Sequence, residues 1–178
     1  MDKPLLILDL DETLIFASEK RMEQDPDFTC GPYAIYCRPY LNEFFQEIIT
    51  DFRFGVWTSS SEDYMECVIK NVIPKEIELE FAYGRQRCTR VIDLSTGEMK
   101  WVKNLKKIKK KGYSLDRVIV VDDTPSKLER NYGNLIRISP WYGSVKDDEL
   151  KYLSKYLNKI SGVSSFRKIE KRFWRSTL

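Results

Sequence analysis

Two aspartates stand close together near the N-terminus, directly after a short apolar run. Asp9 and Asp11 follow residues 5–8, which read LLIL. If that run is a strand, residues two positions apart face the same side, about 7 Å from each other. Carboxylates in this arrangement can serve as a covalent nucleophile, as a general acid or base, or as ligands of a hard metal ion.

A second acidic pair, Asp122 and Asp123, follows another apolar run at residues 118–121. Because parallel strands end at the same edge of a sheet, Asp122 would lie near Asp9 and Asp11. Three neighbouring carboxylates repel one another unless a cation joins them or one pKa is strongly raised. Ligation by oxygen alone favours Mg²⁺. A single acidic pair would be explained as a turn former or helix cap, whereas two such strand ends together favour a metal site.

Hydroxyl groups gather after a further predicted strand. Thr58 and Ser59 follow residues 52–57 and open a helix. Free backbone N–H groups and hydroxyls at a helix N-terminus form an anion site, although capping alone explains Thr58 equally well. Lys103 stands in the first turn of a lysine-rich segment, where the helix dipole disfavours a cation. This placement is a weak hint that Lys103 serves an anion elsewhere.

The composition excludes several other chemistries. The chain has 178 residues, 42% of them apolar and 32% charged, and it contains no histidine. These proportions are typical of a globular chain rather than a disordered or fibrous one. The absence of histidine excludes Ser-His-Asp and Cys-His nucleophiles, histidine-ligated zinc or haem, and a histidine general base. Carboxylates, hydroxyls, lysines, arginines or an oxygen-bound metal must therefore carry the chemistry.

The charges are divided unevenly along the chain. Residues 151–178 carry eight basic groups and one acid, whereas residues 1–150 carry 22 bases and 26 acids. A basic C-terminal tail, residues 164–178, could attract nucleic acid or an acidic partner. Packing of that tail across the acidic body is the favoured interpretation, and we expect neither a membrane nor nucleic acid as the partner.

The cysteines and the N-terminal sequence indicate the cellular compartment in which we expect the protein. The four cysteines, Cys30, Cys37, Cys67 and Cys88, include no C-x-x-C pair, which argues against a four-cysteine zinc site. The apolar run at residues 5–8 is too short for a signal peptide or a membrane span. We therefore expect a cytoplasmic protein with reduced thiols.

Strands and helices alternate along the sequence. Periodicity and capping residues predict strands at 5–8, 52–57, 118–121 and 134–138, and helices at about 38–49, 59–70, 102–111, from 124 and 147–160. This alternation predicts an α/β fold with a mainly parallel sheet flanked by helices, in a single domain over residues 1–178. Residues 78–102, around a Ser95-Thr96-Gly97 turn, are predicted to form a small β-hairpin insertion.

Four short motifs carry a resemblance to a known family. Residues 8–14 (LDLDETL), 57–60 (WTSS), 101–105 (WVKNL) and 120–125 (VVDDTP) stand in this order. They resemble the four motifs of haloacid-dehalogenase (HAD) superfamily phosphatases, in the NLI-interacting-factor or FCP-like branch. The similarity covers roughly residues 3–160, and the basic tail resembles the ending of stand-alone bacterial members. The resemblance implies a HAD-like Rossmannoid fold without a large cap domain.

The resemblance also implies a role for each motif. Asp9 would attack phosphorus and form an aspartyl-phosphate, and Asp11 would act as the general acid and base. Mg²⁺ would bind Asp9, the backbone carbonyl of Asp11, and Asp122. Thr58 and Lys103 would hold phosphoryl oxygens, with Ser59 beside them. Further candidates for the site are Thr13, Arg38, whose role in positioning a loop or touching substrate is left open, and Asp123, which would either contact the metal or cap a helix.

Several functions follow from this pattern. The first is a Mg²⁺-dependent phosphomonoesterase, and an open site favours a phosphoprotein (Ser, Thr or Tyr) over a small metabolite. The RNA polymerase tail, read by an insertion in eukaryotic relatives, is not carried over, because residues 78–102 are short and hold Arg85, Arg87 and Arg90. Two alternatives are a receiver-like binding module without turnover and a metal-dependent nuclease helped by the basic tail.

Overall fold

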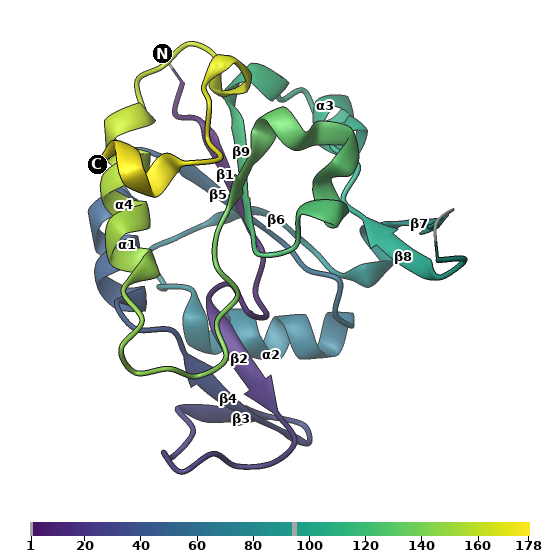
Figure 1. Ribbon diagram of the computed structural model, residues 1–178, viewed down its shortest axis with the longest axis vertical. Coiled ribbons are helices and arrows are strands. Elements are labelled where there is room, and N and C mark those ends of the chain that lie inside the picture. The colour runs from purple at the N-terminus through teal and green to yellow at the C-terminus, as the bar shows by residue number, and fades with distance from the viewer. Residues whose placement is uncertain (1, 94–95) are drawn as a thin grey trace.

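A five-stranded parallel sheet forms the centre of the computed structural model, which describes residues 2–93 and 96–178 (Figure 1). The order across the sheet is β10-β9-β1-β5-β6. The strands are β1 (Leu5–Leu8), β5 (Arg53–Trp57), β6 (Leu79–Tyr83), β9 (Val118–Asp122) and β10 (Leu135–Arg137). The predicted α/β fold with a mainly parallel sheet is confirmed.

Helices cover both faces of this sheet. Residues of β1 and β9 are all buried, and their side chains alternate between two apolar clusters. One cluster packs beneath α1 (Leu41–Ile48), α2 (Glu62–Val72) and α4 (Glu149–Ile160). The other packs beneath α3 (Lys106–Lys110) and the 3₁₀ segment η3 (Pro125–Asn134). Continuous apolar strands are the pattern that a sheet covered on two sides requires.

The helices form near the predicted positions. Leu41, Phe44, Phe45 and Ile48 are buried on one side of α1, as their spacing requires. The segment after Thr124 differs from the prediction, because it is 3₁₀ rather than α-helical and leaves helical geometry at Leu128 and Asn131. Unbroken 3₁₀ runs rarely exceed three or four residues, which explains why this ten-residue segment is interrupted at those two positions.

The predicted insertion at residues 78–102 is only partly correct. The strand β6 (Leu79–Tyr83) pairs with β5 and belongs to the main sheet. A Cβ at Gly55 would lie 2.6 Å from the ring of Phe81, so glycine there lets the two strands meet. The antiparallel hairpin comprises only β7 (Thr89–Ile92) and β8 (Met99–Val102), which project beside α3 (Figure 1). The predicted turn begins at Ser95, which lies outside the described residues.

A small antiparallel sheet lies below the main sheet, over a stretch for which the sequence predicted no element. Its order is β2-β4-β3, with strands β2 (Ile15–Ser18), β3 (Phe28–Cys30) and β4 (Tyr33–Cys37). A disulfide joins Cys30 at the end of β3 to Cys67 on α2. The expectation of reduced thiols is therefore wrong for this pair, because the fold brings together two cysteines that lie 37 residues apart in sequence. Cys37 and Cys88 are free.

The basic C-terminal tail, residues 164–178, packs against the body of the protein. Phe166 in η4 (Phe166–Lys168) and Trp174 in η5 (Trp174–Thr177) are buried in the core. The Trp174 indole N–H donates to the Arg137 carbonyl at 2.9 Å, and Arg175 forms ion pairs with Asp148 and Glu149. This docking confirms the favoured interpretation of the tail. Among the described helices, none has the length and apolar character that crossing a membrane requires.

Candidate active site

The two catalytic strands end side by side. Leu8 of β1 pairs with Val121 of β9, and the Asp9 N–H donates to the Val121 carbonyl at 3.0 Å. Asp9 and Asp122 therefore stand next to each other at the carboxyl edge of the sheet, with side chains 1% and 0% exposed. The chain then turns sharply, and Glu12 adopts a left-handed conformation with φ 56°. The convergence predicted from the strand ends is present.

A buried lysine joins the two carboxylates. The Lys103 Nζ lies 2.8 Å from Asp9 Oδ1 and 2.6 Å from Asp122 Oδ2. Lys103 directly follows β8, and its side chain is completely buried. Its backbone N–H donates to the Lys127 carbonyl at 2.7 Å, which fixes the segment against η3. The one lysine that the sequence singled out is thus in contact with the proposed nucleophile.

A second lysine in the site escaped the sequence reasoning. The Lys127 Nζ lies 2.9 Å from Asp9 Oδ2, 3.6 Å from Asp122 Oδ1 and 3.8 Å from Asp123 Oδ1. Lys127 occupies the first turn of η3, two residues after Pro125. The predicted first-turn position of Lys103 is wrong, because α3 begins only at Lys106, whereas Lys127 does stand in a first turn, where a cation is unfavourable.

The pKa values of Asp9 and Asp122 are shifted in opposite directions by this environment. Burial acts to raise the pKa of Asp9, but the ammonium groups of Lys103 and Lys127 outweigh it and hold that pKa below its usual range. Burial and the neighbouring Asp9 charge raise the pKa of Asp122 to about 6. Asp9 is accordingly the group kept ionised, as a carboxylate nucleophile requires.

Asp11 is held by α2 rather than by the lysines. Its carboxylate accepts hydrogen bonds from Ser60 Oγ at 2.7 Å and from the Tyr64 hydroxyl at 2.6 Å. Burial nevertheless raises the pKa of Asp11, which suits a group that must carry a proton. Tyr64 was not predicted, although it lies in the first turn of the helix that Ser61 caps. The metal contact proposed for the Asp11 carbonyl stays a prediction.

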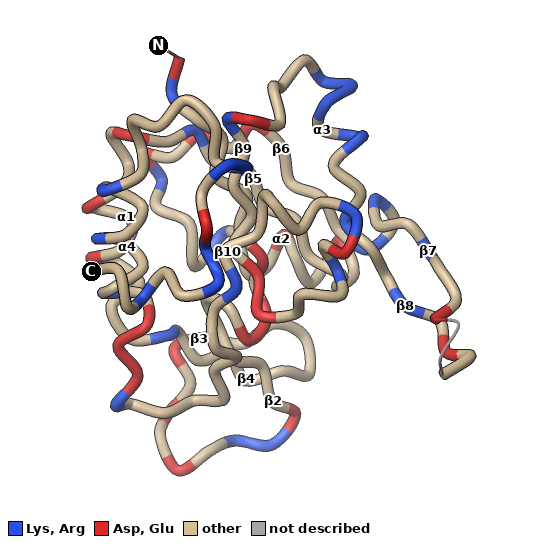
Figure 2. The backbone as a smooth tube through the Cα atoms, turned by 45° about the horizontal axis from the view of Figure 1, so that its top comes forward, with Lys and Arg blue, Asp and Glu red and all other residues tan. Residues whose placement is uncertain are grey.

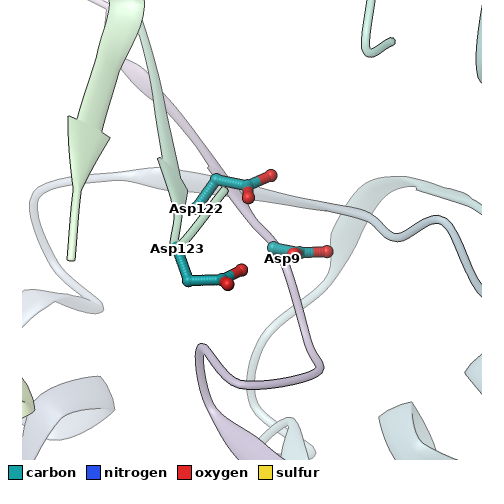
Figure 3. A group of neighbouring side chains, drawn as sticks. All are labelled: Asp9, Asp122 and Asp123. Atoms are coloured by element: carbon teal, nitrogen blue, oxygen red, sulfur yellow. The ribbon is translucent and has the colours of Figure 1, made fainter. Parts of the chain in front are cut away.

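Three carboxylates fit a hard divalent cation. Within the part of the chain that the structure describes, Asp9, Asp122 and Asp123 offer oxygens that lie within 4.8 Å of one another (Figure 3). Asp123 Oδ1 is buried without a hydrogen-bond partner among these residues, and the Lys127 ammonium lies 3.8 Å from it. Buried oxygens in this condition suit a metal, and an all-oxygen set matches Mg²⁺. Asp11 contributes no side-chain oxygen to this group.

The predicted phosphate-binding residues lie at the end of β5. Thr58 is buried, and its Oγ1 accepts a hydrogen bond from the Ser60 N–H at 3.1 Å. The Ser59 carbonyl accepts from Arg85 Nε at 2.6 Å. It is the Ser60 hydroxyl, not that of Ser59, that contacts Asp11. Phosphate binding by Thr58 and Ser59 stays a prediction.

Arg38 and Thr13 stand behind the site. Arg38 is buried and makes two hydrogen bonds to the Asp147 carboxylate, at 2.8 and 2.9 Å. It also donates to the carbonyls of Thr13 and Ser139, at 3.0 and 2.9 Å. Of the two roles left open for Arg38, these contacts favour the positioning of loops. The Thr13 side chain is buried, and its hydroxyl has no partner among the described residues.

Comparisons with known proteins agree with this geometry. The profile of the family described as NLI interacting factor-like phosphatase matches residues 4–167. The "Putative CTD phosphatase-like protein 355R" of Invertebrate iridescent virus 3 is 32% identical over 177 residues, covering 87% of this chain and 95% of the viral protein. The "CTD small phosphatase-like protein 2" of Dictyostelium discoideum is 27% identical over 169 residues, covering 91% of this chain but 28% of that protein.

Solved structures share the fold. "The Structure of Fcp1, an essential RNA polymerase II CTD phosphatase" superposes with a TM-score of 0.60 at 20% identity, over 88% of this chain and 47% of that one. The chain thus spans less than half of some of its relatives and nearly all of the viral protein. The family profile matches most of the length of this chain, which shows that the chain belongs to the NLI interacting factor-like phosphatases of the HAD superfamily.

Proposed function

We propose that the chain hydrolyses phosphate monoesters on proteins, through an aspartyl-phosphate formed on Asp9. The observation that carries this proposal is the buried contact of Asp9 with Lys103 and Lys127, at 2.8 and 2.9 Å. Two ammonium groups keep the carboxylate ionised and reduce its repulsion of a phosphate dianion.

In the first step, an Asp9 oxygen attacks phosphorus, and the bond from phosphorus to the leaving oxygen breaks. Asp11, whose pKa is raised by burial, gives its proton to that leaving oxygen. Tyr64 and Ser60 orient the Asp11 carboxyl through the two hydrogen bonds described above. Lys103 and Thr58 would hold the phosphoryl oxygens.

In the second step, water attacks the phosphorus of the aspartyl-phosphate. Asp11, now a carboxylate, takes a proton from that water, and the bond from phosphorus to the Asp9 oxygen breaks. Inorganic phosphate leaves, and Asp9 is restored. Asp11 thereby fills the acid and base role that histidine has in other enzymes, in a chain without histidine.

Asp9, Asp122 and Asp123 would hold Mg²⁺, with the Asp11 carbonyl as a further ligand. When bound, the ion would neutralise charge on the transferring phosphoryl group and fix its orientation. The buried Asp123 oxygen that lacks a hydrogen bond among the described residues supports this assignment.

A phosphoprotein is the substrate class that we favour over a small metabolite. The antiparallel insertions near the site are small, namely the β2-β4-β3 sheet and the β7-β8 hairpin. They leave room for a macromolecular substrate, and several relatives carry the name CTD phosphatase. A cytoplasmic location also stays a proposal, and the Cys30–Cys67 disulfide removes the reduced thiols on which we based it.

Hydrolysis of an aryl phosphate and of phosphoserine, phosphothreonine and phosphotyrosine peptides, with and without Mg²⁺, tests the proposal. We expect Mg²⁺-dependent turnover that Asp9→Asn and Asp11→Asn abolish. A phosphorylated Asp9 that persists for minutes without turnover would instead favour the receiver-like module. Hydrolysis of phosphorylated small metabolites but of none of the peptides would show that the proposed substrate class is wrong, and the proposed aspartyl-phosphate mechanism would still stand.

A further inference from the structure

A row of charged residues crosses three adjacent strands at the catalytic edge. Leu8 pairs with Val121, which sets Asp9 beside Asp122, and Asp122 pairs in register with Arg137 of β10. Neighbouring strands lie about 4.8 Å apart, so the backbone of Arg137 is about 10 Å from that of Asp9. Arg137 is exposed, whereas Asp9 and Asp122 are buried.

Two hollows open beside Arg137, between the sheet edge and the C-terminal tail. One, of about 430 Å³, is lined by Tyr132, Gly133, Leu135, Arg137 and residues 167–172. The other, of about 500 Å³, shares Arg137 and Arg172 and extends to Ser139 and Pro140. We call the two together the tail groove. The second hollow lies next to the loop that follows β1, because Trp141, the residue after Pro140, donates its N–H to the Glu12 carbonyl at 2.9 Å.

Three of the cations that line the tail groove contribute no ion pair or hydrogen bond to the described fold. Arg137, Arg167 and Lys168 are exposed, and their side chains form no ion pair or hydrogen bond within residues 2–93 and 96–178. Glu170, the acid in the first hollow, is already bound by Arg172 at 2.6 Å. Figure 2 shows basic residues on β10 and on the tail segment beside it. Two other cations of the groove do hold the fold: Arg175 in the second hollow forms ion pairs with Asp148 and Glu149, and Lys171 in the first donates to the carbonyls of Phe166 and Ile169.

We propose that the tail groove binds an acidic or phosphorylated side chain of the phosphoprotein substrate, about three residues from the phosphoresidue at Asp9. This inference rests on the proposed function. An extended peptide advances about 3.3 Å per residue, so three residues span the 10 Å from Asp9 to Arg137. The guanidinium of Arg137 can bind a carboxylate or a phosphate with two hydrogen bonds, which gives the contact both strength and direction.

A peptide fits this groove better than nucleic acid does. Of the three free cations, Arg137 stands in register with Asp122, whereas Arg167 and Lys168 belong to η4, which packs against η2 (Leu115–Arg117) before β9, so the three form no stripe along the active site. Residues 1–150 carry 26 acids against 22 bases, so a long polyanion that extends beyond the groove would meet a body of net negative charge. A peptide with one or two acidic groups places its charge only at the groove.

Paired phosphopeptides test the proposal. Each pair shares one phosphoserine and differs only in carrying Glu or Ala three residues away, on either the N-terminal or the C-terminal side. We expect the better Glu peptide to show about tenfold higher kcat/KM than its Ala partner, as one charge-assisted contact would give. Arg137→Ala should remove that preference and leave hydrolysis of an aryl phosphate unchanged. Arg130→Ala, an exposed arginine of η3 outside the lining of the groove, is the matched control and should keep the preference.

The possible outcomes distinguish failure of the groove proposal from failure of the proposed function. Equal rates on Glu and Ala peptides, with normal hydrolysis of both and of the aryl phosphate, would overturn the groove proposal and leave the proposed function standing. If no substrate is hydrolysed, the proposed function fails, and fluorescence anisotropy of the same peptides on the Asp9→Asn protein still decides the groove. Tighter binding of the Glu peptide that Arg137→Ala removes would support it. Equal binding of the two peptides, or tighter Arg137-dependent binding of an oligonucleotide of the same charge, would overturn it.

Discussion

Two buried ionic clusters lie at the same edge of the sheet and differ in how completely their charges are satisfied. One is the catalytic cluster of Asp9, Asp122, Lys103 and Lys127, with Asp123 at its side. The other is the pair of Arg38 and Asp147. Both bury charge, which is costly unless each ion is paired and hydrogen-bonded.

The Arg38 pair meets that condition in full. Its guanidinium donates to both Asp147 oxygens and to the backbone carbonyls of Thr13 and Ser139. The catalytic cluster does not, because Asp123 Oδ1 is buried without a hydrogen bond among the described residues and the Lys127 ammonium is 3.8 Å away from it. Complete satisfaction indicates a structural role, and incomplete satisfaction indicates atoms held ready for a metal or a substrate. The predictions below test this distinction.

The largest effect should come from the nucleophile. Asp9→Asn keeps the shape of the side chain but removes the anion, so we expect aryl phosphate hydrolysis to fall at least about 10³-fold. The protein should stay folded, because Lys103 keeps Asp122 as its ion-pair partner, and circular dichroism checks this. Full activity in this variant would show that Asp9 is not the nucleophile, and the catalytic cluster would then resemble the Arg38 pair.

The opposite result is expected for Arg38. Arg38→Met leaves the Asp147 carboxylate and the carbonyls of Glu12, Thr13 and Ser139 without their donor, and we expect a loss of about 3–5 kcal/mol in the free energy of unfolding. Arg53→Met is the matched control, because its side chain is 40% exposed and its ion pair with Glu80 is 3.8 Å long. That change should cost less than about 1 kcal/mol. Urea unfolding measures both. A fall in kcat without a loss of stability would instead place Arg38 at the substrate.

The sequence predicted the catalytic edge well, for a physical reason. Fully buried strands such as β1 and β9 need continuous apolar runs, so the acids that follow them mark the strand ends unambiguously. Lys127 was missed because η3 was expected to be an ordinary helix, in which a lysine faces solvent. Its position depends on the turn after Pro125, which no periodicity encodes.

The unpredicted elements depend on distant partners. Strands β2, β3 and β4 are short and only partly buried, and their register is set by one another rather than by a local pattern. The same is true of Cys30 and Cys67, whose pairing follows from the contact of β3 with α2. Trp57 and Tyr83 pack edge to face, but only the folded sheet shows that β6 belongs there and not in the insertion.

Lys127 provides a further test of how the catalytic cluster differs from the Arg38 pair, because Lys127 and Lys103 together give the Asp9 carboxylate two ammonium partners. Burial acts to raise the pKa of Asp9, and the two lysines lower it. Since the ionised form is the nucleophile, activity is lost as pH falls through that pKa. Removing one cation in Lys127→Met raises the pKa, so the acid limb of the kcat/KM profile should move to higher pH. We also expect kcat/KM to fall by about 10²-fold at neutral pH.

The control for Lys127→Met is Lys106→Met, an exposed lysine on α3. That variant should keep both the rate and the profile of the unmodified chain. An acid limb that stays in place in Lys127→Met, despite a lower rate, would mean that Lys127 acts on the phosphoryl group without influencing Asp9.

Tyr64 tests whether the hydrogen bonds to Asp11 matter for the reaction. Tyr64→Phe removes the 2.6 Å bond that lowers the pKa of Asp11, against the larger effect of burial that raises it. The pKa should therefore rise, and the alkaline limb of the profile should move to higher pH, because Asp11 must carry a proton in the first step. We expect a fall in kcat of roughly tenfold, from the loss of one charge-assisted contact. Tyr33→Phe, whose ring packs edge to face on Tyr64, is the control and should change neither limb.

Asp123 should give the smallest effect and decides between two roles. Its Oδ2 accepts a hydrogen bond from the hydroxyl of Thr124, the N-cap residue of η3, at 2.9 Å, which suits a structural role at the start of that segment. Its buried Oδ1 has no hydrogen-bond partner in the described chain, which suits a metal. Asp123→Asn keeps an acceptor for Thr124 but removes the charge. If Asp123 contacts the ion, Mg²⁺ affinity measured by calorimetry should weaken about tenfold, and the melting temperature without added metal should stay the same. An unchanged Mg²⁺ affinity would leave Asp123 only its structural contact with Thr124, and the unsatisfied oxygen would then no longer separate the catalytic cluster from the Arg38 pair.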